Sequence, residues 1–150
     1  MNYGDIISVI QDYQEGLSRN FLFERTDHII KYYPNSWEGY FIKAELFIDS
    51  KEYDQALKVI NEGIRKTNTK ELYYQKAKIL KEIDLQQAIE IYTYLIQIDD
   101  NAYPCVQACY LTNNIDQIII YCDLYFDYHP ITIANLENAF AVFTILLTEY

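Results

Sequence analysis

Apolar residues recur at helical spacing along the whole chain. In residues 52–66 they stand at i, i+3, i+4, i+7 and i+11, which is the pattern of one face of an amphipathic helix. The same periodicity predicts nine helices, with breaks at Gly16, at Tyr33-Pro34 and at His129-Pro130. The predicted helices cover residues 4–15, 19–33, 36–49, 52–66, 69–82, 85–98, 102–112, 115–128 and 131–148. We therefore expect an all-α fold.

Polar residues mark where several of these helices begin. Four predicted helices follow an Asn or Asp that has Glu or Gln three residues later, a spacing like that of a capping box. These positions are Asn35, Asn68, Asp84 and Asn114, the last in an Asn113-Asn114 turn. Ser18 is a plausible cap for the second helix. Pro104 is tolerated only in a first turn, so its helix should begin near residue 102 or 103.

Small residues repeat in a way that pairs the helices. Ala44 and Ala56 stand twelve apart, one in each of two consecutive helices, where small side chains let helices approach closely. The pair returns as Ala77 and Ala88, and a partial copy follows around Ala108 and Ile118. The repetition predicts helix pairs over approximately residues 3–33, 34–68, 69–100 and 101–130, followed by a terminal helix over 131–148.

Residues 34–68 carry a more specific pattern. Tyr40, Ala44 and Phe47 in the first helix, then Glu52 to Leu57, Ile60 and Gly63 in the second, resemble the tetratricopeptide repeat (TPR), a helix–turn–helix unit of about 34 residues. Tyr40 takes the place of the signature tryptophan. Lys43 and Asn68 depart from the pattern, which has leucine and proline there.

The resemblance implies one TPR-like domain over residues 1–150. Such a domain is an α-solenoid, a right-handed superhelical array of antiparallel helix pairs. Helical hairpins of another solenoid family remain an alternative. Glycine (4) and proline (3) are scarce, and no flexible linker interrupts the chain, as continuous helical packing requires.

The chain shows no feature of a secreted or membrane protein. Residues 1–10 lack a basic region and contain Asp5, and no apolar run approaches the about 20 residues that span a bilayer. Three cysteines are an odd number and are expected to be reduced thiols. We therefore expect a cytoplasmic protein that does not contact membranes.

The net charge of −10 is unevenly distributed. Residues 1–81 hold all 12 basic residues and 12 acidic ones, whereas residues 82–150 hold 10 acidic residues and no Lys or Arg. A nucleic-acid partner is not expected, because it would need a basic footprint. The acidic half suits a protein partner of basic character, although acidity can also serve solubility alone.

The first helices of successive repeats should carry the binding site. In TPR proteins these helices line the concave face, which holds an extended segment or a partner helix. The candidates here are Glu38, Phe41 and Glu45 in one repeat and Tyr74 and Lys78 in the next. The two glutamates stand seven apart with Phe41 between them, so all three share one helical face. This acidic and aromatic strip suits a cationic or mixed peptide; a merely solvated face is the alternative.

The cysteines and one histidine are candidates for metal binding. Cys105 and Cys109 stand at i and i+4, and Cys122 and His129 follow downstream, so four ligands could in principle gather around a tetrahedral metal. Small buried thiols are the commoner use of cysteine, and we predict no metal and no cofactor. The sequence has no P-loop and no GxGxxG, GxSxG or HExxH motif, so an enzyme is not expected.

The last predicted helix is unusually apolar. Thr144 is the only polar residue in 139–147, and a helix that is apolar all round favours burial all round. The candidate interface residues are Phe140, Phe143, Leu146 and Leu147. Pairing with a second copy is favoured. Capping of the array's own groove, or a chain that is part of a longer protein, are the alternatives.

The sequence therefore predicts a non-enzymatic scaffold. It would bind a partner protein or peptide through the concave face or through the apolar C-terminal helix. The alternative is an acidic inhibitor of the immunity type, whose lysine-free half neutralises a basic partner.

Overall fold

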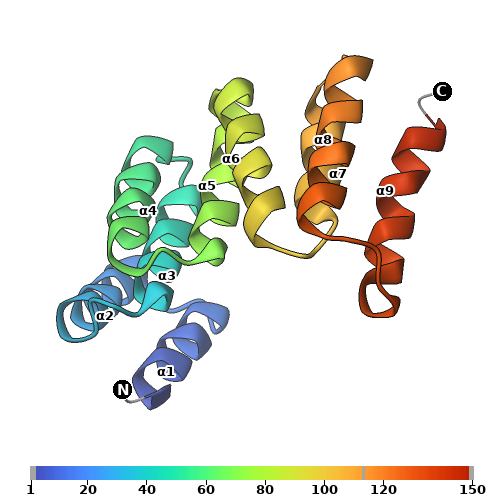
Figure 1. Cartoon of the computed structure of the whole chain (residues 1–150). Coiled ribbons are helices and arrows are strands. Elements are labelled where there is room, and N and C mark those ends of the chain that lie inside the picture. Colours follow the sequence, from blue (N-terminus) through green and yellow to red (C-terminus); the bar gives the residue numbers. More distant parts are fainter. Residues whose placement is uncertain (1–2, 113, 149–150) are drawn as a thin grey trace. The chain divides into compact units, whose positions relative to one another are not determined.

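The computed structural model describes residues 3–112 and 114–148, and the part it describes is helical with no strand (Figure 1). The all-α fold predicted from the periodicity is confirmed. The elements are α1 (Tyr3–Gln14), α2 (Arg19–Tyr32), α3 (Trp37–Asp49), α4 (Tyr53–Thr67), α5 (Lys70–Ile83), α6 (Leu85–Ile98), α7 (Tyr103–Leu111), α8 (Ile115–Tyr128), the 3-10 helix η1 (Ile133–Asn135) and α9 (Leu136–Thr148). None of the described helices has the length and apolarity needed to cross a bilayer.

Side-chain caps begin several helices at the predicted positions. The backbone N–H of Gln87 donates to Asp84 Oδ1 at 3.0 Å, and that of Asp116 donates to Asn114 Oδ1 at 2.9 Å. The expected cap at Asn35 is wrong, because the N-cap of α3 is Ser36, without a side-chain cap bond. Asn113, which the sequence places in a turn with Asn114, lies outside the described residues.

Asn68 ends α4 instead of beginning α5. It adopts the left-handed conformation with φ 49°, and its backbone N–H donates to Ile64 O at 2.9 Å. Asparagine tolerates this conformation better than most residues, and a residue in it is a common way for a helix to end. Asn68 therefore lies at a helix boundary, as predicted, but it caps the end of α4 and not the start of α5.

The chain divides into two compact units, Met1–Ile79 and Leu80–Tyr150. In the first unit α3 and α4 lie side by side and run in opposite directions (Figure 1). Ala44 and Ala56 are fully buried in the core cluster of this unit, as the pairing argument requires. The other buried members of the cluster are Tyr40, Ile60, Leu72 and Ile79. A smaller cluster of Ile6, Val9, Ile29 and Ile42 lies among α1, α2 and α3.

The second unit is built on α6, α7 and α8, which contact one another. Its small residues Ala88 and Ala108 are fully buried, and so is Tyr125. The phenol of Tyr125 donates to Asp100 O at 2.8 Å, which satisfies the one polar group of this buried ring.

The last helix begins at Leu136, whereas the periodicity places its start at residue 131. Thr132 and Asn135 form a capping box around η1, with the Thr132 N–H donating to Asn135 Oδ1 at 2.8 Å. Because these hydrogen bonds hold residues 133–135 in a 3-10 turn, the α-helix begins only after them. α9 packs on α7 and α8 and buries Ala139 and Val142.

Most of the other apolar side chains of α9 stay in contact with solvent. Phe140 is 71% exposed and Leu147 79%, Phe143 is exposed beside the ring of Phe126, and Leu146 is half-buried. The burial on all sides that its composition favours is therefore not reached within the described chain.

Candidate peptide-binding groove

Helix α3 presents a half-buried face beside its buried one. Tyr40 and Ala44 point into the core of the first unit, whereas Glu38, Phe41 and Glu45 are half-buried. The three half-buried residues lie three or four positions apart, so they line one side of the helix.

Gly39 allows α2 to pack closely against α3. A Cβ atom built on Gly39 would stand 2.8 Å from Ile29 Cγ2, closer than such contacts allow. The absence of a side chain at Gly39 therefore brings the two helices into close contact.

A hollow of about 310 Å³ lies between α1 and the half-buried face of α3. Its wall is mainly apolar, with carboxylates at two positions. The lining residues are Ile10, Tyr13 and Gln14 of α1 and Trp37, Glu38, Phe41, Ile42 and Glu45 of α3. The rings of Trp37 and Phe41 meet edge to face at 88°, with centroids 5.6 Å apart, a favoured aromatic geometry. We refer to this hollow as the α1–α3 groove.

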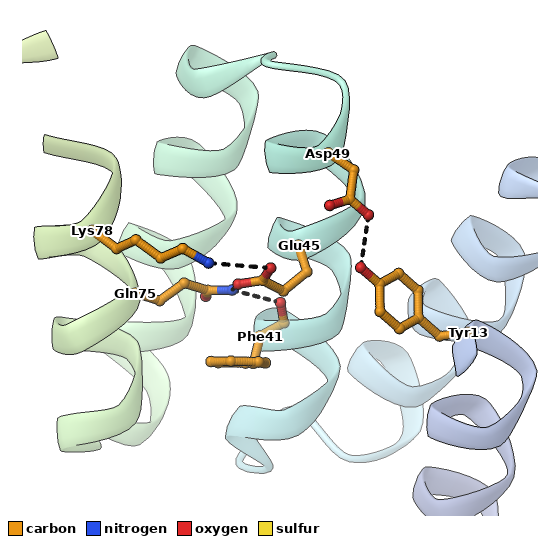
Figure 2. A network of polar contacts seen from close by, with 6 residues as sticks. All are labelled: Tyr13, Phe41, Glu45, Asp49, Gln75 and Lys78. Carbon is orange, nitrogen blue, oxygen red and sulfur yellow. Dashed lines mark hydrogen bonds and ion pairs between the residues drawn. The ribbon is translucent and has the colours of Figure 1, made fainter. Parts of the chain in front are cut away.

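Helix α5 holds Glu45 in place from the side (Figure 2). The Gln75 amide Nε2 donates to Glu45 Oε1 and to Phe41 O, both at 2.9 Å. Lys78 Nζ lies 3.8 Å from Glu45 Oε2. Gln75 is buried, so its hydrogen bond to Glu45 is shielded from water and fixes the orientation of the carboxylate.

A second contact fixes the end of α1 to the end of α3. The Tyr13 hydroxyl donates to Asp49 Oδ2 at 2.7 Å (Figure 2). This hydrogen bond, together with burial and the negative charge of Asp49, raises the pKa of Tyr13 to about 12. Tyr13 therefore stays a neutral donor at ordinary pH and holds one wall of the groove.

The charge of the groove is less negative than the two glutamates alone would make it. The ammonium of Lys78 partly neutralises Glu45. The Ser36 hydroxyl donates to a carboxylate oxygen of Glu38, which holds that side chain but leaves its charge unchanged. Seven residues of helix separate Glu38 from Glu45, which is about 10 Å along the axis. The groove is therefore mainly apolar, with Glu38 and Glu45 in its wall and the carboxylate of Glu45 turned toward α5 (Figure 2).

Three of the five predicted binding residues line the groove. They are Glu38, Phe41 and Glu45. Lys78 contributes through its ion pair with Glu45, whereas Tyr74 is half-buried on α5 and is not among the lining residues.

Gln75 and the whole α1 wall of the groove were not predicted from the sequence. Gln75 did carry a signal, since it interrupts the apolar stripe of α5 between Leu72 and Ile79. A polar residue at a buried position requires hydrogen-bond partners. The α1 residues carried no comparable signal, because the pattern within a helix does not say which later helix it faces.

The cysteines come together without the histidine. The sulfur atoms of Cys105, Cys109 and Cys122 all lie within 4.8 Å of one another. His129 Nε2 is 2.5 Å from Ile96 O, and among the residues described the cluster has three members and no histidine. The set of four ligands considered from the sequence is therefore not assembled.

Comparison with known proteins supports the architecture. Neither a protein-family model nor a curated protein matches the sequence. Among solved structures, the chain is similar to a thermophilic TPR protein of Thermus thermophilus, with a TM-score of 0.59 and 15% identity over 93% of this chain and 78% of that one.

Two structures of MamA give similar values. The MamA RS-1 ArsTM double mutant matches with a TM-score of 0.63 and 13% identity, over 93% of this chain and 89% of that one. MamA from residue 41 to the end, from Desulfovibrio magneticus RS-1, matches with 0.61 and 12%, over 93% and 88%. Likeness at these identities concerns the fold alone. The chain has the TPR-like helical repeat fold.

Proposed function

We propose that the chain is a non-enzymatic interaction module that binds an extended segment of a partner protein in the α1–α3 groove. The observation that carries this proposal is a mainly apolar hollow with two glutamates in its wall, lined in part by side chains that neighbouring helices hold in place. Such preorganisation lowers the entropic cost of binding, because the side chains are ordered before the ligand arrives.

The dimensions and chemistry of the groove suggest what it would hold. Its volume of about 310 Å³ is at the lower end of the roughly 300–1,000 Å³ typical of ligand pockets, so it suits one or two anchoring side chains. Trp37 and Phe41 offer aromatic surface to an apolar residue or to the stem of a Lys or Arg. Glu38 can then accept from a cationic head group. We therefore expect a segment with a large apolar residue near a basic one.

A displayed library of short random peptides tests this proposal. Selection on the purified protein should enrich peptides that combine an apolar anchor with Lys or Arg, and Phe41→Ala should abolish their binding. Phe47→Ala is the matched control, because Phe47 is a half-buried phenylalanine of the same helix that packs on Phe23 outside the groove. Equal loss of binding in both variants, or selected peptides without basic residues, would refute the assignment.

The charge distribution favours a second candidate function, an acidic protein that neutralises a basic partner. Residues 82–150 have 10 acidic residues and no Lys or Arg. Association driven by that surface should slow steeply with rising ionic strength, because salt screens exposed charges. Binding in a largely apolar groove should change much less over the same range.

We also propose that α9 forms an interface with a second copy of the chain. Its exposed side chains Leu136, Phe140, Phe143 and Leu147 make an apolar surface, and such surfaces mark interaction sites more often than chance. A shallow hollow of about 480 Å³ beside Phe140 could receive a side chain of the partner copy. A chain that stays monomeric at high concentration would contradict this part of the proposal.

A further inference from the structure

The hairpin of α7 and α8 gathers every cysteine of the chain. Cys105 and Cys109 stand one turn apart on α7, and Cys122 faces them from α8. All three cysteines are buried, with exposed fractions of 0% for Cys105, 3% for Cys109 and 0% for Cys122. The Sγ atoms of Cys109 and Cys122 are 3.9 Å apart, and all three sulfurs lie within 4.8 Å of one another.

These separations fit three sulfur ligands around one ion. Three atoms 4.8 Å apart share a centre about 2.8 Å from each, so inward shifts of about 0.5 Å reach the ~2.3 Å of a metal–thiolate bond. The 3.9 Å between Cys109 and Cys122 already equals the spacing of two sulfurs that bind one ion at that distance in a trigonal plane.

The ligand set selects the kind of ion. Thiolates prefer soft ions such as copper(I) and zinc. Structural zinc sites are almost always four-coordinate, and within residues 3–112 and 114–148 the cluster includes no fourth Cys, His, Asp or Glu. His129 is held instead by the carbonyl of Ile96. Three thiolates in a dry site therefore suit copper(I) better than zinc.

We propose that Cys105, Cys109 and Cys122 bind one copper(I) ion through their three sulfurs. Two of the thiols now donate weakly to backbone carbonyls of α8, Cys105 to Tyr121 O at 3.5 Å and Cys109 to Ile118 O at 3.9 Å. Binding replaces these long contacts with metal–sulfur bonds and releases the displaced protons to solvent. The ion fastens α7 to α8, and this role is independent of the α1–α3 groove.

Anaerobic titration of the reduced full-length protein with copper(I), against a coloured copper(I) chelator, tests the proposal. The expected result is one copper ion per chain, a higher melting temperature, and an X-ray absorption spectrum with three sulfur neighbours. Serine at any one of the cysteines should weaken binding at least about tenfold, since even residues behind the ligands contribute that much. Circular dichroism checks that each variant folds, and the absorption spectrum of the unaltered protein needs no variant.

Three outcomes would overturn the assignment. They are two or fewer sulfur neighbours, copper binding that persists when all three cysteines are serine, and zinc that displaces the copper.

Discussion

Replacing Gly63 with alanine tests the packing of the first unit most sharply. A Cβ atom built on Gly63 of α4 would stand 2.7 Å from Leu72 Cδ1 and 2.8 Å from Tyr40 Cβ and Cγ. Carbon atoms at their optimum are about 3.5–4.0 Å apart, so both neighbours would have to move by nearly 1 Å. Tyr40 cannot move easily, because it is 1% exposed and its hydroxyl donates to Pro34 O at 3.1 Å.

The size of the effect follows from two opposing terms. Adding atoms to a filled core costs about 1–3 kcal/mol, and the fixed position of Tyr40 favours the upper end of that range. Alanine gains about 1 kcal/mol over glycine in helix propensity. We therefore expect Gly63→Ala to lower the free energy of unfolding by about 2 kcal/mol, measured by urea denaturation. Faster amide hydrogen exchange in α3 and α4 should accompany the loss.

Asn61→Ala provides the control. Asn61 lies on the exposed side of α4, so its replacement changes helix propensity without changing the packing. This variant should be as stable as the unaltered protein or slightly more stable. If Gly63→Ala behaved in the same way, α4 would not lie against Tyr40 and Leu72 as described.

Three further variants test other contacts. Lys78→Met should change the free energy of unfolding by less than about 1 kcal/mol, because the Lys78 side chain is 65% exposed and exposed ion pairs contribute little. A larger loss in urea denaturation would contradict this. Asp49→Asn should lower the pKa of Tyr13 from about 12 toward 10. The tyrosinate absorbance of Tyr13 is obtained by subtracting the titration of a Tyr13→Phe variant, once with Asp49 present and once with Asp49→Asn. Because the folded state raises this pKa, the Tyr13 contribution to stability is complete below about pH 10 and is lost as the pH rises through about 12; unchanged stability over that range would contradict it. If α9 pairs with a second copy as proposed, Phe140→Glu with Leu147→Glu should shift the mass in solution from dimer to monomer without unfolding the chain, since both side chains are exposed.

The helices could be predicted because their signals are local. The apolar periodicity and the caps at Asp84 and Asn114 lie within single helices, and the predicted helices start within two residues of the observed ones except for α9. The start of α9 was missed because Thr132 and Asn135 bond to each other in a turn that the apolar period does not reveal.

The site could be predicted only in part. Glu38, Phe41 and Glu45 share a face of one helix, and that much follows from spacing alone. The α1 wall and the bonds from Gln75 join helices that are far apart in the sequence, so they depend on how the hairpins pack. The cysteine cluster has the same origin, since spacing pairs Cys105 with Cys109 but the fold supplies Cys122.

Mapping of backbone amide shifts by NMR will show whether a peptide binds in the α1–α3 groove. A library-selected peptide is added to the isotopically labelled protein, and the shifts are followed to saturation. We expect the largest shift changes at Ile10, Tyr13, Trp37, Phe41 and Glu45, with none of comparable size beyond residue 80. Changes confined to the acidic residues of 82–150, with the groove unaffected, would contradict it.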